Sequence, residues 1–114
     1  MAEEYVQVTW TIDDEEAALN LARIAVRRRK AACAQVGAAP IRSVYWWDGQ
    51  VESASEWAVT AKTTRSRLDQ LIDLIRSNHP YETPEIIATP IVGGFGPYLD
   101  WVSEETAERA SPVD

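Results

Sequence analysis

Two residues of this sequence have side chains suited to binding a transition metal, His79 and Cys33. A neutral imidazole is a common ligand for copper and zinc, and a thiolate is a soft ligand for the same metals. The two residues lie 46 positions apart, so their spacing matches no metal-binding motif. The structural alternatives are a helix-end imidazole bonded to backbone and a small hydrophobic residue on a strand. Both residues remain candidate metal ligands that only the fold can bring together.

The segment after His79 is rich in polar-tipped side chains. Its polar members are Tyr81, Glu82 and Glu85. Pro80 and Pro84 stiffen the segment, which limits the entropy lost when a ligand binds. A rigid connector would explain the prolines but not the clustering, so we predict a cleft here. Lys62 ends a predicted strand and is a further candidate for the cleft, with a solvated strand end as its alternative.

The basic run Arg27-Arg-Arg-Lys30 has two interpretations. It could contact a phosphate group or nucleic acid. It also closes a predicted helix that opens with four carboxylates, Asp13-Asp-Glu-Glu16, and charges placed in this way complement the helix dipole. We favour the dipole interpretation.

The sequence contains no recognisable catalytic constellation. It has no nucleophile elbow and no HExxH pattern, and the spacing of Gly93-Gly-Phe-Gly96 does not fit a phosphate-binding loop. We therefore expect a protein that is not an enzyme.

The longest predicted element is a β-hairpin centred on Asp48-Gly49. This dipeptide tolerates the positive φ angles of a type I′ turn, whose twist matches the flanking strands. If strand character reaches back to Cys33, each arm has about 14 residues and spans about 45 Å, whereas a domain of this size is about 35 Å across. The ribbon must bend, for which Gly37 and Pro40 are suited, or project and pair with another subunit. The predicted interface residues are Tyr45, Trp46, Trp47, Asp48, Gly49 and Trp57.

The order of predicted elements is β-α-β-β-α-β-α, in one domain over residues 1–114 with a frayed tail at 108–114. The predicted strands are 5–12, 32–47, 50–62 and 85–91, and the predicted helices are 13–30, 63–78 and 98–107. Thr63 or Thr64 is the expected N-cap of the second helix, and Ser66-x-x-Asp69 has the form of a capping box one turn further in. Two βαβ-type halves around a central hairpin predict an α+β fold, the ferredoxin-like sandwich, with an added C-terminal helix.

Charge and composition limit the partners. The formal net charge of the 114 residues is −7, which argues against nucleic acid and against an anionic membrane. The single cysteine cannot form an intrachain disulfide, so a reducing compartment is expected. The longest uncharged run is too short to span a bilayer, and the first residues do not resemble a secretion signal. We expect a cytoplasmic protein.

Five segments, in order over nearly the whole chain, form a specific joint pattern. They are Ala31-Ala-Cys-Ala34, Ser43-Val-Tyr-Trp-Trp-Asp-Gly49, Lys62-Thr63, Ser77-Asn-His-Pro-Tyr-Glu-Thr-Pro-Glu85 and Pro97-Tyr-Leu-Asp-Trp101. This pattern resembles the CutA family of divalent-cation tolerance proteins. The resemblance implies a ferredoxin-like homotrimer whose long hairpins pair between subunits, with Cu²⁺ and other divalent cations as ligands. The number of subunits comes from the resemblance alone.

The resemblance also bears on the metal ligands. Some family members have a cysteine at the end of the first strand and two histidines before the proline. Here those positions hold Trp10 and the pair Asn78-His79, so two of the implied ligands are absent. We therefore expect weak metal binding of low selectivity, through His79 first and Cys33 second.

Three functions follow from this sequence. The first is tolerance or homeostasis of divalent metals, copper above all, by a metal-binding homotrimer. The second is a signalling trimer similar to PII that binds a nucleotide or another small ligand between subunits, which the lack of an evident phosphate cradle makes less favoured. The third is a structural or anchoring trimer without a ligand.

Overall fold

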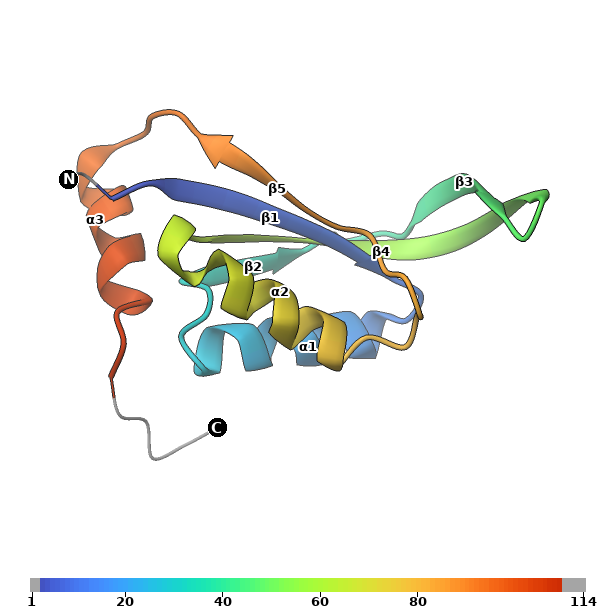
Figure 1. The fold of residues 1–114 in the computed structure, drawn as a ribbon, viewed down its shortest axis with the longest axis horizontal. Coiled ribbons are helices and arrows are strands. Elements are labelled where there is room, and N and C mark those ends of the chain that lie inside the picture. Colours follow the sequence, from blue (N-terminus) through green and yellow to red (C-terminus); the bar gives the residue numbers. More distant parts are fainter. Residues whose placement is uncertain (1–2, 110–114) are drawn as a thin grey trace.

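The computed structural model describes residues 3–109 and contains one antiparallel sheet and three α-helices (Figure 1). The elements are β1 (Tyr5–Ile12), α1 (Glu15–Arg27), β2 (Cys33–Val36), β3 (Ile41–Trp47), β4 (Gln50–Thr64), a 3₁₀ turn (Arg65–Arg67), α2 (Leu68–Ser77), β5 (Ile86–Ile91) and α3 (Gly96–Glu105). The predicted tail at 108–114 lies largely outside the described residues.

The sheet has the strand order β2-β4-β1-β5, and β3 pairs with the distal part of β4. Every pairing is antiparallel; Trp10 of β1, for example, lies between Val59 of β4 and Ile86 of β5. Helices α1 and α2 lie side by side on one face of this sheet (Figure 1). The α+β, ferredoxin-like prediction with a long central hairpin and an added C-terminal helix is confirmed.

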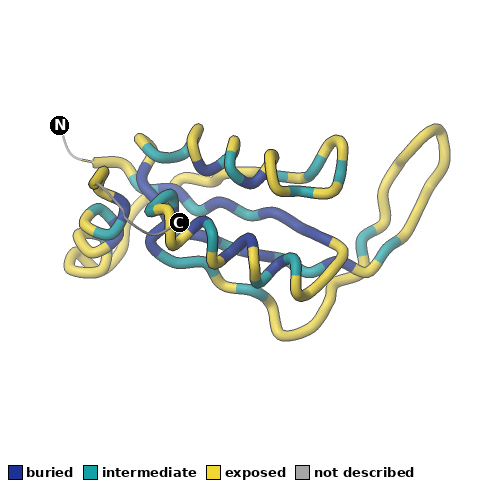
Figure 2. Tube along the Cα trace, turned by 90° about the horizontal axis from the view of Figure 1, so that it is seen from below, coloured by how far each residue is buried: buried dark blue, intermediate teal, exposed yellow. Residues whose placement is uncertain are grey.

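The core lies between the sheet and these two helices (Figure 2). Alternation along β1 turns Val8 and Trp10 toward the helices, where neither is exposed to solvent. The predicted apolar faces meet them, with Leu21 from α1 and Leu71 from α2. Burial of an aliphatic or aromatic side chain stabilises the fold by about 1.5–3 kcal/mol, so this cluster holds the layers together.

The first two helices begin in different ways. Asp14 caps α1, and its carboxylate accepts a 2.9 Å hydrogen bond from the backbone N–H of Ala17. The expectation that Thr63 or Thr64 caps α2 is wrong for α2 itself, whose N-cap position is Arg67, because β4 continues through both threonines to pair with β1. Thr64 takes the N-cap position of the 3₁₀ turn that precedes α2, without a side-chain capping bond. The hydroxyl of Thr63 instead donates to the carbonyl oxygen of Lys30 at 2.6 Å, and α2 begins at Leu68 after the 3₁₀ turn.

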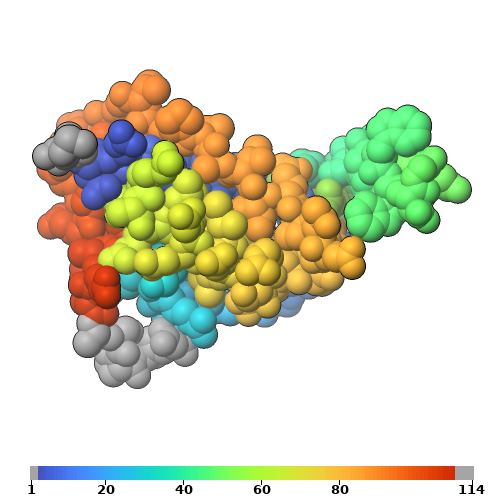
Figure 3. Space-filling view, viewed as in Figure 1, coloured from blue at the N-terminus to red at the C-terminus, as the bar shows by residue number. Residues whose placement is uncertain are grey.

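The hairpin of β3 and the distal part of β4 projects from the body of the molecule. Asp48 and Gly49 have φ angles of 52° and 76°, as the type I′ turn requires. The strand is interrupted between Val36 and Ile41, at the bend expected near Gly37 and Pro40. Figure 3 shows the hairpin (green) as a separate lobe, and the longest dimension of the molecule is 46 Å. Trp46 is 74% exposed and Trp47 is 53% exposed.

Helix α3 closes the end of the sheet that lies opposite the hairpin (Figure 1). The hydroxyls of Tyr5 and Ser103 are 2.7 Å apart, which joins the start of β1 to α3. Arg29, after the end of α1, forms a 2.8 Å ion pair with Glu105, the last residue of α3. The added helix is therefore tied to both layers of the sandwich.

Candidate functional site

A cleft of about 740 Å³ lies between the root of the hairpin and the connector from α2 to β5. Its lining comes from β1, the hairpin and the connector: Thr11, Ser43, Val44, Tyr45, Trp46, Trp47, Glu56, Tyr81, Glu82, Thr83, Pro84 and Glu85. Figure 3 shows the connector, in orange, against the root of the hairpin. The structure thus brings the polar segment 81–85 and the hairpin aromatic residues, which the sequence suggested separately, to one site.

His79 fixes the start of this connector. Pro80 lacks a backbone donor and disfavours helical geometry in the residue before it, so α2 ends at Ser77. The ring atom Nε2 of His79 lies 2.7 Å from the carbonyl oxygen of Thr11, and the backbone N–H of Tyr81 donates to Nδ1 at 3.2 Å. Since a carbonyl only accepts, Nε2 carries the proton and donates. Both ring nitrogens are therefore engaged, as expected for an imidazole bonded to nearby backbone.

Tyr81 connects the same segment to the hairpin. Its hydroxyl donates a 2.8 Å hydrogen bond to a carboxylate oxygen of Glu56, which is only 7% exposed. The ring packs edge-on against His79 with ring centres 4.6 Å apart. Burial, together with the hydrogen bond and the negative charge of Glu56, raises the pKa of the Tyr81 hydroxyl well above its ordinary value. Tyr81 therefore stays a neutral donor at neutral pH.

The carboxylates of the cleft differ in their surroundings. Glu82 and Glu85 are exposed at the rim, whereas Glu56 is buried at the hairpin root. Carboxylate oxygens are hard ligands that suit divalent cations. Among residues 3–109, however, no three or more histidine, cysteine, aspartate or glutamate side chains are grouped so as to hold a metal ion. One copy of the described chain therefore has acidic groups in a cleft but not a complete metal site.

Cys33 and Lys62 are paired with each other on β2 and β4 and do not line the cleft. Lys62 pairs with Gln7 on β1, four residues from Thr11, which is about 13 Å along the strand. His79 contacts Thr11, so the structure does not bring His79 and Cys33 together. The ammonium of Lys62 donates to the side chain of Gln35.

The thiol of Cys33 lies 3.4 Å from the hydroxyl of Tyr98 on α3, within hydrogen-bond distance. This contact, together with partial burial, raises the pKa of Tyr98 to about 12. Cys33 is half-buried on β2. This position fits the alternative interpretation of Cys33 as a small hydrophobic residue on a strand.

The hairpin residues divide into three groups. Tyr45, Trp46 and Trp47 line the cleft, while Asp48 and Gly49 form the tip. Trp57 is half-buried and packs against the core cluster.

Glu56 and Thr11 are members of this site that the sequence did not predict. Glu56 lies 25 positions from Tyr81, so no short-range motif joins them. The available signal was a charged residue just before the buried stretch of β4, where a carboxylate needs a hydrogen-bond donor.

The described residues include no helix with the length and hydropathy needed to cross a membrane. The cytoplasmic location stays a prediction.

The sequence is similar to those of known proteins. The family model described as CutA1 divalent ion tolerance protein matches residues 6–105. The chain is 40% identical over 98 residues to the chloroplastic protein CutA 1 of Oryza sativa subsp. japonica, which covers 86% of this chain and 55% of that protein. It is 39% identical over 102 residues to the divalent-cation tolerance protein CutA of Salmonella newport, covering 88% of this chain and 86% of that protein.

A solved structure agrees with these sequence matches. The crystal structure of CutA1 from Oryza sativa superposes with a TM-score of 0.88 at 38% identity, over 93% of this chain and 96% of that chain. The chain spans little more than half the length of the curated plant relative and most of the bacterial one.

Proposed function

The chain belongs to the CutA1 divalent ion tolerance protein family, and on this premise we propose that it contributes to divalent-cation tolerance as a metal-binding homotrimer. The cations meant are Cu²⁺ first and other divalent metals after it. They are the cargo of the protein, and the proposal assigns it no catalytic step.

One observation carries this proposal: the cleft at the hairpin root combines three carboxylates with the aromatic residues most exposed on the hairpin. Glu82 and Glu85 supply oxygen ligands on the connector wall, and Glu56 supplies them at the root of the hairpin. The opposite wall is the hairpin, which we propose as the surface for neighbouring subunits. Metal binding and assembly would then occur at the same place.

The donor groups of one subunit fit a loosely held cation better than a tightly bound resident one. To coordinate a metal, His79 would have to give up its hydrogen bond to Thr11 or the one from Tyr81. Cys33 lies at another part of the sheet, next to Tyr98. We therefore propose weak binding by the cleft carboxylates, completed by water or by a neighbouring subunit. His79 and Cys33 are the ligands that only a local rearrangement would recruit.

Assembly follows from the exposed hairpin. A projecting ribbon with large apolar side chains tends to aggregate unless a neighbour covers it, and Val44, Trp46 and Val51 are each more than half exposed. A closed ring of copies would cover these side chains without leaving an edge that propagates. We propose the trimer, the number that the family resemblance implies.

A second candidate is a signalling trimer similar to PII, and the cleft volume favours it. Small-molecule sites measure about 300–1,000 Å³ and combine aromatic walls with a few polar groups, a description that fits this cleft. An anchoring trimer without a ligand is the third possibility.

Calorimetric titration of the metal-free protein separates the three candidates. The ligands are Cu²⁺, Zn²⁺, ATP and AMP. The site variant is Glu82→Gln/Glu85→Gln, and Asp69→Asn/Asp73→Asn on α2 removes the same two charges outside the cleft. Saturable metal binding that the site variant loses and the control keeps would support the proposal. Saturable nucleotide binding without metal binding would support the signalling candidate, and no binding would support the anchoring one.

Two further variants test the sequence-derived ligands. We expect His79→Ala to weaken Cu²⁺ binding indirectly, by releasing the connector, and Cys33→Ser to leave it unchanged. A complete loss of Cu²⁺ binding in Cys33→Ser would show that the thiol is a ligand and that the cleft is not the main site.

A further inference from the structure

A second cavity, of about 220 Å³, lies at the end of the molecule opposite the hairpin. It is formed where α1 ends, where α2 begins and where α3 ends. Its basic and amide side chains are Arg28, Arg29, Lys30, Arg67, Gln70 and Arg109. Five of the 11 basic residues of this acidic chain therefore line one small cavity.

The end of α1 places its basic residues in an unusual way. The N–H of Arg29 bonds to the carbonyl of Val26, and the N–H of Lys30 to that of Ala25, which is a Schellman motif. The residue with positive φ in this motif is usually glycine, but here it is Arg29, with a φ of 61°. A left-handed conformation costs a non-glycine residue about 1–2 kcal/mol, so the side chain must contribute something that glycine would not.

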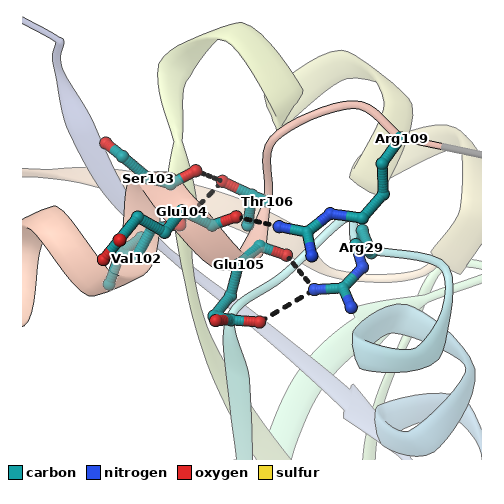
Figure 4. Close-up of polar contacts among 7 residues, drawn as sticks. All are labelled: Arg29, Val102, Ser103, Glu104, Glu105, Thr106 and Arg109. Carbon is teal, nitrogen blue, oxygen red and sulfur yellow. Dashed lines mark hydrogen bonds and ion pairs between the residues drawn. The ribbon is translucent and has the colours of Figure 1, made fainter.

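Part of that contribution is structural. The guanidinium of Arg29 donates to the backbone carbonyl of Glu105 at 3.2 Å and to its carboxylate at 2.8 Å (Figure 4). Arg67 donates to the carbonyl of Thr106 at 2.7 Å, and Arg109 donates to the carbonyl of Glu104. These bonds involve carbonyls at the end of α3, where an α-helix leaves its last carbonyls without intrahelical partners. The carbonyl of Glu104 also accepts the backbone N–H of Ala107, at 3.4 Å.

The same contacts hold four of the cations in place: Arg29, Lys30, Arg67 and Arg109. Backbone carbonyls bind three of them, and the side-chain amide of Gln70 accepts from Lys30 at 2.9 Å. Among residues 3–109, the carboxylates paired with these four cations are Glu105, at Arg29, and Glu108, which is 88% exposed and 3.7 Å from Arg67. Lys30 and Arg109 have no carboxylate partner among residues 3–109, and with about half a negative charge for each of the two helix ends a surplus of about one positive charge remains.

We propose that this cavity binds a small oxyanion, the phosphate group of a small phosphorylated molecule or free phosphate. Guanidinium groups match the geometry of phosphate oxygens, and hydrogen bonds with a charged partner are the stronger ones. Because neutral partners already hold the side chains, little conformational entropy is lost when the anion enters. The site is separate from the acidic cleft, and each subunit carries it whole.

The interpretation of the run Arg27–Lys30 as a contact for a phosphate group thus applies to its last three residues. Arg27 ends α1 in the last turn, as the dipole argument expects. The next three residues leave the helix and face the cavity with Arg67 and Arg109. A purely structural role, tying α1 and α2 to the end of α3, is the competing account.

The test is calorimetric titration of the full chain, in a low-salt buffer free of phosphate and sulfate, with inorganic phosphate and separately with glycerol 3-phosphate. The site variant is Lys30→Gln/Arg109→Gln, which spares the partly buried Arg67. The control is Arg23→Gln/Arg76→Gln, which removes two exposed cations from the helices outside the cavity. Circular dichroism checks that both variants fold.

We expect saturable binding that falls by about tenfold or more in the site variant and by less than about twofold in the control. Backbone amide signals of Lys30 and Gln70 should shift on titration, and added NaCl should weaken binding. Equal affinity for the two ligands would place the recognition in the phosphate group, and tighter binding of glycerol 3-phosphate would point to an organic phosphate. No saturable binding in millimolar ligand, or equal losses in both variants, would overturn the proposal.

Discussion

His79 donates a 2.7 Å hydrogen bond from Nε2 to the carbonyl oxygen of Thr11, near the end of β1. This bond holds the connector that follows α2 against the sheet. Tyr81, two residues later, is thereby placed to reach Glu56 at the hairpin root. His79, a candidate metal ligand in the sequence, thus also shapes one wall of the cleft.

The hairpin aromatics should control assembly. We predict that Trp46→Ala shifts the protein toward lower mass in light scattering at micromolar concentration, from three times the 12.7 kDa subunit mass in the parent. Buried aromatic residues are typical hot spots, each contributing about 2 kcal/mol or more to an interface. Val92→Ala, at a fully exposed position outside the hairpin, is the control and should leave the mass unchanged. A monomeric parent would contradict the proposed assembly.

Metal removal should affect the fold little. We expect the surface buried on assembly to contribute more to the stability of the fold than a weakly bound ion does. EDTA should therefore lower the melting temperature by less than about 10 °C. The melting temperature should rise with protein concentration, as for any linked association. Differential scanning calorimetry measures both. A larger drop in EDTA would mean that the metal holds the fold together.

The left-handed conformation of Arg29 gives a prediction about stability. Arg29→Ala loses the contacts with Glu105 and keeps the backbone strain, whereas Arg29→Gly loses the contacts and relieves the strain. We expect the glycine variant to be more stable than the alanine variant by about 1 kcal/mol. Chemical denaturation at one fixed protein concentration measures the difference. Equal stabilities would indicate that the positive φ is not strained.

The ionisation of Tyr81 reports on the cleft. Its pKa is raised by burial first and by Glu56 second, so Glu56→Gln should lower the pKa while leaving it above the ordinary value. A phenol with a raised pKa in the folded state stabilises the fold fully below its unfolded pKa. That stabilisation is lost as pH rises through the folded value, and the variant should lose it at lower pH.

Ultraviolet titration of the phenolate, as the difference between each protein and its Tyr81→Phe counterpart, measures this shift. Tyr98, whose pKa is raised to about 12 by Cys33 and burial, is an internal control that Glu56→Gln should not alter. An unchanged Tyr81 titration in Glu56→Gln would mean that the hydrogen bond between the two residues does not persist in solution.

The elements of the fold were predictable from the sequence because local patterns specify them. Asp48-Gly49 specifies its turn, and Pro80 specifies the end of α2, within a few residues. The N-cap of α2 was predicted wrongly, because pairing with β1 extends β4 through Thr63 and Thr64, and Thr64 precedes only the 3₁₀ turn. The preference of a threonine for a capping position does not decide its conformation when pairing with a neighbouring strand satisfies the same backbone groups.

The site was less predictable, since its parts come from distant segments. The clustering of polar side chains after His79 did indicate a cleft wall. The contact between Tyr81 and Glu56 depends on how the connector crosses the hairpin root, which no sequence spacing shows. The position of Arg29 was hidden for another reason: the usual glycine of its motif is absent, so the sequence shows only a basic run.

The central claim is that the cleft at the hairpin root binds divalent cations, and counting bound metal tests it most directly. The metal-free protein is dialysed to equilibrium against a series of Cu²⁺ or Zn²⁺ concentrations, and the metal bound per chain is measured by mass spectrometry. We predict saturable binding that Glu82→Gln/Glu85→Gln loses and Asp69→Asn/Asp73→Asn keeps. Binding that never saturates, or that both variants retain equally, would contradict the claim.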